Sequence, residues 1–519
     1  MNIRTTEHRT PSPTPSSAPF PASVPAAAVP APSRPGVGQL CAPYAEAVLG
    51  HAGRDWLRLN VPGHAAAPGS DLAAFFGPRI TALDFPPLLD GIDLGRDTPL
   101  DRALALAAEA WGARRTWFLT NGASQGNQIA SMVAPALGRT LVVQRSVHSS
   151  VIDGLVLSGM DAVFVQPSVD PEQGIAHGVT AADVAAALER TPDAAAVYVV
   201  SPSYFGAVAD VRAIADAAHA AGVPLIVDEA WGSHFGFHPG LPANALSLGA
   251  DLMTSSTHKL AGSLTQSAML HLAEGPFADL LEPLVDRAFR LVQSTSASAL
   301  LTASLDLARR NLVTDADATG SSVEAADRVR GAVRALGRFT VVSDGFHAFP
   351  DIVRADPLRI AIDTRVGGIT GHEARRRLFR DHQVMVEVST DAAIVAVIGA
   401  GSVPDTDRFV EALHTLPSPL TTDSAGTAGG MLRLPAPGAT KLTARGAFLS
   451  PAVVVAAEEA VGRISADTLA AYPPGIPNVL PGEVITAEAV RFLQRTAAAP
   501  NGHVRGALDP GVTRLRVVA

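Results

Sequence analysis

Lys259 is one of only two lysines in the chain, and it stands after the partly apolar run DLMTSS, next to Ser256, Thr257 and His258. The small residues of LAGSLTQSAML follow it, so its amine is expected to be poorly solvated. Desolvation disfavours the charged form of an amine, and a neutral amine is the form that attacks a carbonyl to give a Schiff base. A lone lysine is more often a surface residue in a turn, so this interpretation needs further residues in support.

Asp228 is the first supporting residue. It follows the short apolar run PLIV, which predicts a central parallel strand, and α/β sheets bind ligands at the carboxyl ends of such strands. A carboxylate at this position could hold a pyridine nitrogen protonated, which lets pyridoxal phosphate act as an electron sink. Taken alone, Asp228 is as readily interpreted as a helix cap or a turn residue.

Two further segments suggest parts of the same kind of site. The segment 118–128, FLTNGASQGNQ, predicts a strand, a turn and a helix, and Gly122, Ala123 and Ser124 leave backbone N–H groups free to bind an anion. It lacks the Lys-Ser/Thr ending of a nucleotide P-loop, so the signal is weak by itself. His148 follows another apolar run, and its flat ring could stack on a flat cofactor, although an isolated histidine is more often structural.

The chain resembles the Orn/Lys/Arg decarboxylase family of fold-type I pyridoxal phosphate enzymes. The resemblance extends from about Pro62 to the C-terminus, and its most distinctive part is YPPGIP followed by PGE. The motifs that carry it are, in order, TNGASQGN, RSVHSS, SPSYFG, VDEAWGSHF, SSTHKLAGSLTQSAML, QSTSASALLTASLD and YPPGIPNVLPGE.

This resemblance implies a role for each matching residue. Lys259 becomes the Schiff-base lysine, Asp228 the partner of the pyridine nitrogen, and His148 the residue stacked on the ring. In this family the active site lies at a dimer interface, which implies a homodimer or a higher homo-oligomer with shared sites. The remaining implied roles are phosphate contacts by Ala123, Ser124 and Ser256, a place beside the imine for His258, a place near the cofactor for Ser203 and Tyr204, and a contribution to the neighbouring subunit's pocket by Ser294, Thr295 and Ser296.

The chain departs from the family pattern at several positions near the expected site. Ala65 follows His64 where a basic residue is usual, Ser149 stands where a lysine is usual, and Trp231 replaces the histidine of Asp-Glu-Ala-His. Proline and an aromatic residue are common where the chain has Ala297 and Ala299. These departures leave the substrate open. Trp231 is interpreted equally well as a specificity residue and as a core-packing residue.

Composition excludes several other classes of protein. With 519 residues, 47% of them hydrophobic, the chain can form two or three domains with a sizeable core. The net charge of −9 argues against a nucleic-acid partner, and no run reaches the roughly 20 apolar residues that span a bilayer. Its single cysteine, Cys41, excludes an intrachain disulfide and fits a reducing cytoplasm, and the isolated histidines show no metal-ligand spacing.

The pattern of elements predicts an α/β protein with a fold-type I large domain, built on a mostly parallel sheet, and a small α+β region at the C-terminus. A linker is expected at 417–430. The expected regions are a Pro/Ala/Ser-rich disordered tail at 1–38, an N-terminal arm at 39–100, the pyridoxal phosphate-binding large domain at 101–310 and the C-terminal α+β region at 311–519.

The sequence therefore predicts a pyridoxal phosphate-dependent decarboxylase that converts lysine, arginine or ornithine to the corresponding amine and CO2. An aminotransferase or a decarboxylating oxidase acting on a related amino acid is the alternative with the same cofactor. A non-catalytic protein that has kept the fold is the alternative from another class, and the presence of both Lys259 and Asp228 argues against it.

Overall fold

The computed structural model describes residues 37–417, 435–472, 476–499 and 502–519. The predicted tail, apart from its last two residues, and most of the predicted linker lie outside these ranges. Among the described residues, no helix combines the length and the apolar character needed to cross a bilayer.

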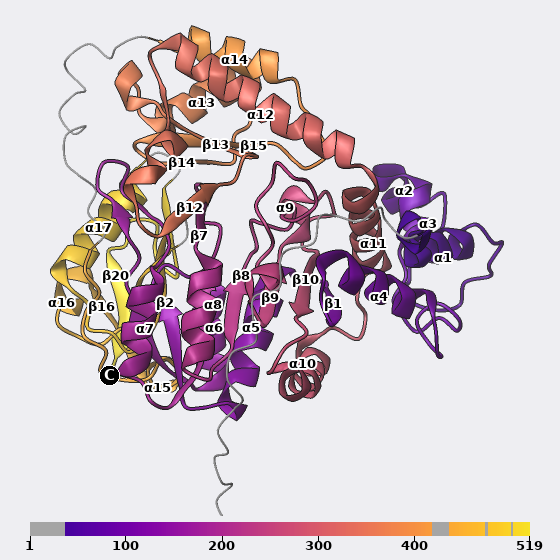
Figure 1. Cartoon of the computed structure of the whole chain (residues 1–519), viewed down its shortest axis with the longest axis horizontal. Coiled ribbons are helices and arrows are strands. Elements are labelled where there is room, and N and C mark those ends of the chain that lie inside the picture. The colour runs from indigo at the N-terminus through magenta and orange to yellow at the C-terminus, as the bar shows by residue number, and fades with distance from the viewer. Residues whose placement is uncertain (1–36, 418–434, 473–475, 500–501) are drawn as a thin grey trace, which may run out of the picture. The chain divides into compact units, whose positions relative to one another are not determined.

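A seven-stranded sheet forms the core of the large domain (Figure 1). Four of its strands, in the order β9, β8, β6 and β2, pair in parallel, and the edge strand β3 pairs in parallel with β2. Strand β10 runs antiparallel between β1 and β9. In spatial order the strands are β1 (Arg115–Leu119), β10 (Ala268–Leu272), β9 (Leu252–Ser255), β8 (Leu225–Asp228), β6 (Ala194–Val200), β2 (Thr140–Gln144) and β3 (Asp161–Val165).

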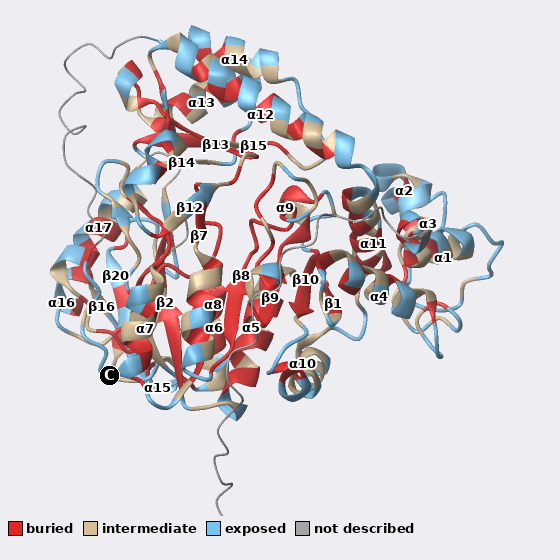
Figure 2. Ribbon diagram, viewed as in Figure 1, coloured by how far each residue is buried: buried red, intermediate tan, exposed pale blue. Residues whose placement is uncertain are grey.

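Both faces of this sheet are apolar because successive residues of a strand point to opposite sides. In β8, for example, Leu225 and Val227 belong to one hydrophobic cluster and Ile226 to the other. The central strands are accordingly buried almost throughout (Figure 2). Helices cover both faces: α4 (Pro99–Trp111), α7 (Ala181–Glu189), α8 (Val211–Ala220) and α11 (Ala299–Thr314) pack in the first cluster, and α5 (Gly122–Val133), α6 (Ser149–Ser158) and α10 (Ala278–Val292) pack in the second.

The strand directions bring the candidate site residues to one edge of the sheet. Strands β1, β2, β8 and β9 all run the same way, so the segments that follow them meet at their carboxyl ends. Helix α5 follows β1, the His148 segment follows β2, Asp228 ends β8, and the short helix α9 (Thr257–Leu260) follows β9.

Residues beyond α11 form two further units. The first has an antiparallel sheet in the order β11 (Thr340–Val341), β13 (Arg359–Asp363), β15 (Ala393–Val397) and β14 (Val388–Ser389), with helices α12 (Ala316–Leu336), α13 (Gly371–His382) and α14 (Thr406–Thr415). The second contains α15 (Ala444–Leu449), α16 (Ala457–Ala460), α17 (Ala487–Ala498), the strand pair β16 (Ala452–Ala456) and β20 (Arg514–Val518), and the sheet β18 (Ile476–Val479), β17 (Leu469–Tyr472) and β19 (His503–Arg505).

Short elements complete the described structure. They are the 3-10 helices Val37–Leu40, Ala134–Ala136, Leu246–Leu248, Val342–Ala348 and Arg365–Gly367, the hairpin of β4 (Val169–Asp170) and β5 (Ile175–Ala176), the pair β7 (Ala207–Ala209) and β12 (Ile352–Ala355), and the arm helices α1 (Pro43–Ala52), α2 (Asp71–Phe76) and α3 (Pro78–Leu83).

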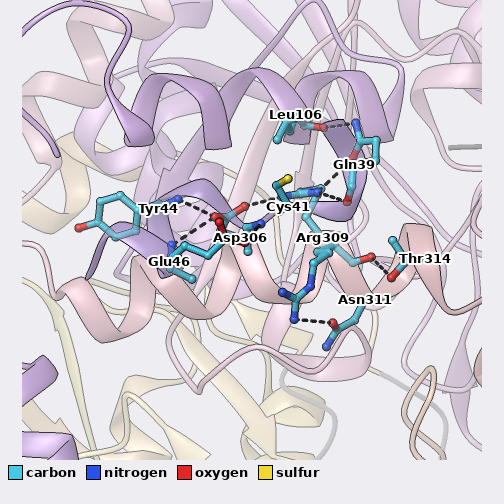
Figure 3. A network of polar contacts seen from close by, with 12 residues as sticks. Gln39, Cys41, Tyr44, Glu46, Leu106, Asp306, Arg309, Asn311 and Thr314 are labelled. Atoms are coloured by element: carbon cyan, nitrogen blue, oxygen red, sulfur yellow. Dashed lines mark hydrogen bonds and ion pairs between the residues drawn. The ribbon is translucent and has the colours of Figure 1, made fainter. Parts of the chain in front are cut away.

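A buried ion pair attaches the start of the arm to α11 (Figure 3). Arg309 bonds to Asp306 at 2.6 Å and also donates to the backbone carbonyls of Gln39 and Cys41. The other Asp306 oxygen accepts the N–H of Tyr44, at the beginning of α1, at 2.9 Å. Neither charged side chain is exposed, and removing one partner of such a pair typically costs about 3–5 kcal/mol. The arm is therefore fixed to α11 by charge and hydrogen bonds as well as by packing.

Candidate active site

Lys259 lies on the single turn of α9, immediately beyond the end of β9. Its backbone N–H donates to the carbonyl of Ser256 at 2.9 Å, which closes this turn. The pKa of the Lys259 amine is lowered to about 8, chiefly by burial; Arg359 acts in the same direction, and the carboxylates of Asp228 and Glu387 act in the opposite one. A substantial neutral fraction near physiological pH is what a nucleophilic lysine needs.

Asp228 is buried at the end of β8, and neutral donors fix its carboxylate. One oxygen accepts the side-chain N–H of Asn127 at 2.8 Å, and the other accepts the backbone N–H of Ala230 at 3.0 Å. Asn127 is itself held, because its oxygen accepts the Tyr198 hydroxyl at 2.9 Å and its nitrogen also donates to Ser150. This network fixes the direction in which the carboxylate points.

Close approach of α5 to the sheet places Asn127 within reach of Asp228. A Cβ atom at Gly126 would lie 2.6 Å from the Thr254 side chain on β9, so a glycine is required there. Helix α5 then presents its next residue, Asn127, to the end of β8. The glycine-containing motif thus positions a hydrogen-bond donor as well as the start of the helix.

His148 is the residue that precedes α6 and caps it. Its Nδ1 accepts the backbone N–H of Ser150 at 3.2 Å and lies 2.8 Å from the Ser150 hydroxyl. Burial lowers the pKa of the His148 imidazole to about 4; Lys259 and Arg505 lower it too, whereas Asp228 raises it. The ring is therefore neutral at neutral pH, and the cap fixes its orientation.

The N-terminus of α5 offers an anion-binding end to this site. Within the described residues, the side chain of Asn121 does not cap the first turn. The backbone N–H groups of Ala123 and Ser124 therefore lie at the positive end of the helix without a side-chain cap. Ser256 is buried beside Lys259, and the buried hydroxyls of Thr254 and Thr257 have no hydrogen-bond partner in the described part of the chain. Unpartnered buried hydroxyls are rare, and these lie in the β9–α9 segment that carries the lysine.

Trp231 lies directly beside Lys259. The Lys259 Nζ is 4.0 Å from the centre of a Trp231 ring, and the Arg359 guanidinium carbon is 3.8 Å from it. Trp231 is also buried and packs against Leu241 and Leu260. The core-packing interpretation therefore applies, and the indole also contacts two cations of the site, while its role in specificity stays a prediction.

Arg359 is a second cation of the site that the motifs did not indicate. Burial lowers the pKa of its guanidinium to about 10, although Asp356, Glu387 and Tyr204 oppose this shift. One nitrogen donates to the backbone carbonyl of Tyr204, whereas Nε and Nη1 have no hydrogen-bond partner among the described residues. Two unused, buried N–H groups on a cation favour an anionic ligand at this position.

The other residues predicted from the sequence make mainly local contacts. His258 sits beside Lys259 on α9, and its Nδ1 lies 2.9 Å from the Ser267 carbonyl. The Ser203 hydroxyl accepts the N–H groups of Phe205 and Ala207, so it serves its own loop. Tyr204 stands edge-on to Trp231. The segment Ser294, Thr295 and Ser296 is exposed between α10 and α11.

Sequence reasoning missed Asn127, Tyr198, Arg359 and Glu387. Asn127 lies one helical turn after Ala123, so the helix period contained a usable signal for it. Arg359 begins β13 and Glu387 directly precedes β14, both more than 90 residues after Lys259, and no local pattern marks them. No group of three or more potential metal-binding side chains occurs in the residues that the structure describes.

Comparison with known families confirms the resemblance seen in the motifs. The model for the major domain of Orn/Lys/Arg decarboxylases matches residues 42–362, and the model for their C-terminal domain matches residues 433–502. The arginine decarboxylase of Bacillus subtilis is 33% identical over 476 residues, covering 90% of this chain and 96% of its own. The arginine decarboxylase of Halalkalibacterium halodurans is 34% identical over 494 residues, covering 92% and 97%.

Solved structures confirm the predicted fold class. The lysine decarboxylase of Francisella novicida superposes with a TM-score of 0.77 at 20% identity, covering 93% of this chain and 82% of that one. The lysine decarboxylase A of Pseudomonas aeruginosa gives a TM-score of 0.76, also at 20% identity, covering 93% and 81%. At this level of identity the likeness establishes the fold alone.

The lowered pKa of Lys259 leads to a first prediction. Competitive acetylation of the cofactor-free protein over a range of pH should give Lys259 a reactivity midpoint at a pH of about 8, where its amine loses its proton. At pH 7 roughly a tenth of the amine would then be neutral. The exposed Lys441 serves as the internal reference in the same digest. A Lys259 midpoint close to the ordinary lysine value of about 10.4 would contradict the geometry.

Proposed function

Because the chain belongs to the Orn/Lys/Arg decarboxylase family, we propose that it removes the α-carboxyl group of a basic amino acid with the help of pyridoxal phosphate bound at Lys259. The observation that carries this proposal is the meeting of Lys259, Asp228 and His148 at one edge of the sheet, each at or just beyond the end of a different strand. The candidate substrates are lysine, arginine and ornithine.

The residues of the site fit pyridoxal phosphate. The buried, hydrogen-bonded carboxylate of Asp228 suits a protonated pyridine nitrogen. The neutral ring of His148 suits stacking on the pyridine. The uncapped start of α5, with Ser256 and the unpartnered Thr257 hydroxyl, suits a phosphate group. When bound, pyridoxal phosphate supplies the electron sink for the bond that breaks.

The protein groups then have distinct tasks. Asp228 holds the proton on the pyridine nitrogen, and Asn127 with Tyr198 keeps its carboxylate in place. Lys259, with its lowered pKa, holds the cofactor and can afterwards carry a proton to the α-carbon. His258 lies next to Lys259, and the indole of Trp231 lies against the amine.

Two opposite charges suit the two ends of a basic amino acid. Arg359 offers unused N–H groups beside Trp231 to an α-carboxylate. Glu387 raises the pKa of both Lys259 and Arg359, which places its negative charge in the same electrostatic environment. An exposed carboxylate there suits the distal ammonium or guanidinium group of the substrate. Arginine is the first substrate to test, because relatives named arginine decarboxylases match over at least 90% of this chain.

We also propose that the active form is a homodimer with shared sites. The arm between α1 and α4 exposes many large apolar side chains, including Leu57, Leu59 and Phe75. Apolar groups gathered in this way mark interaction surfaces. The exposed segment Ser294–Ser296 lies next to α11, the helix to which the arm is attached, and would reach the neighbouring pocket.

The decisive experiment is incubation of the reconstituted protein with arginine, lysine and ornithine under air, while CO2, amine, keto acid and peroxide are followed together. The proposal predicts one amine and one CO2 for each amino acid consumed, and no activity in Lys259→Ala. Borohydride reduction and peptide mapping should find the cofactor on Lys259 rather than on Lys441. Keto acid without CO2 would indicate an aminotransferase, and peroxide with CO2 a decarboxylating oxidase. A colourless protein that does not take up the aldehyde would indicate the non-catalytic alternative.

Glu387→Gln tests the assignment of the distal charge. The change keeps the shape of the side chain and removes its negative charge, so KM for the preferred basic amino acid should rise about ten-fold, which corresponds to about 1.4 kcal/mol. The cofactor should remain bound, because Glu387 is not among its expected contacts.

The matched control is Glu411→Gln, which removes an exposed carboxylate from α14 of the same unit. It should leave KM unchanged. Equal KM values in the Glu387 variant and the wild type would remove Glu387 from the substrate site.

A further inference from the structure

The His148 segment is held at its beginning by a buried arginine. Arg145 directly follows β2, and its guanidinium donates to the carbonyl of Pro477 at 2.7 Å and to the carboxylate of Glu483 at 3.1 Å. The side chains of Arg145 and Glu483 are 7% and 3% exposed. Glu483 also accepts the N–H of Leu480 at 2.9 Å, so it closes its own loop while it holds Arg145. The motifs RSVHSS and YPPGIPNVLPGE are therefore in direct contact.

The same segment is held a second time just after His148. Arg505 on β19 donates to the hydroxyl of Ser149, the first residue of α6, and pairs with Asp153 at 3.4 Å. Arg505 therefore brings a positive charge to the first residue of α6.

These polar contacts lie in the interface between α6 and the C-terminal unit, which also contains a cavity. A cavity of about 290 Å³ remains between α6 and the C-terminal unit, lined by Ile152, Leu155 and Met160 on one side and by Leu442, Leu480 and Glu483 on the other. The start of α6 is packed as well, because Val147 and Val151 belong to the second hydrophobic cluster. The two arginines add polar anchors on either side of His148: Arg145 lies three residues before it, and Arg505 bonds to the residue after it.

We propose that the C-terminal unit positions His148 through this C-terminal clasp, formed by Arg145 with Glu483 and by Arg505 with Ser149. His148 caps α6 with its own ring, so a shift of the helix start changes the plane in which the ring lies. The clasp residues do not touch the reacting atoms; they act through His148. The consequence for cofactor binding rests on the proposed function, whereas the mechanical coupling does not.

Two variants separate the clasp from folding. Arg505→Gln removes a charge that is about half exposed, so the fold should tolerate it. The double variant Arg145→Met with Glu483→Gln removes both buried charges together, which avoids leaving one of them uncompensated. The matched control is Arg516→Gln, which breaks a similarly exposed arginine pair with Asp467 at 2.9 Å in the same unit.

Hydrogen exchange of peptides covering residues 146–155 is the first measurement, made on the full chain without cofactor. Both clasp variants should exchange there several-fold faster than the wild type, and the control should not. The second measurement is the affinity for pyridoxal phosphate and the visible circular dichroism of the bound cofactor. We expect affinity to fall about ten-fold and the dichroism to change, because misplacement by about 1 Å is enough to impair a positioned group. Arg505→Lys should restore both.

The possible outcomes test the C-terminal clasp separately from the proposed function. Unchanged exchange in both clasp variants would overturn the clasp whatever the protein does with pyridoxal phosphate. If the double variant does not fold, Arg505→Gln decides by itself. Faster exchange with unaltered cofactor affinity and dichroism would overturn the positioning of His148. A wild-type protein that takes up no pyridoxal phosphate would contradict the proposed function, while the exchange measurement would still decide on the coupling.

Discussion

The buried carboxylate of Asp228 is the constraint around which the site is arranged. A carboxylate taken out of water costs several kcal/mol unless hydrogen bonds or opposite charge compensate it. Here the side chain of Asn127 and the backbone N–H of Ala230 supply part of that compensation, and Tyr198 holds Asn127 from behind. Their geometry depends on α5 lying close to β9, which Gly126 allows. The proposed protonated pyridine would supply the remaining, positive partner.

Charges from distant parts of the chain complete the site around this carboxylate. Lys259 loses proton affinity through burial and Arg359, and regains part of it from Asp228 and Glu387. Arg359 and Glu387 belong to the unit that contains α12, whereas Arg505 and Glu483 belong to the last unit. The large domain by itself supplies only the strand ends at which the site lies. The two C-terminal units add the charges that suit a substrate and the contacts that hold the His148 segment.

Much of this arrangement could be predicted because the main candidates follow strands with strong local signals. PLIV before Asp228, the glycine-containing turn before α5 and the apolar run before His148 each mark the carboxyl end of a strand, and parallel strands bring such ends together. The partners of these residues could not be found in this way. Arg359 begins a strand of a different sheet and Glu387 directly precedes another, and the contact between Arg145 and Glu483 joins residues 338 positions apart. Such pairs depend on how the units dock, which no local periodicity encodes.

We expect Asp228 to hold the pyridine nitrogen of the bound cofactor protonated. The most direct test is the ¹⁵N chemical shift of the pyridine nitrogen in protein reconstituted with ¹⁵N-labelled pyridoxal phosphate, compared between the wild type and Asp228→Asn. We expect a protonated signal in the wild type and an unprotonated one in the variant, because asparagine keeps the shape but removes the charge. A protonated signal of equal strength in both proteins would contradict it and would assign that proton to another group.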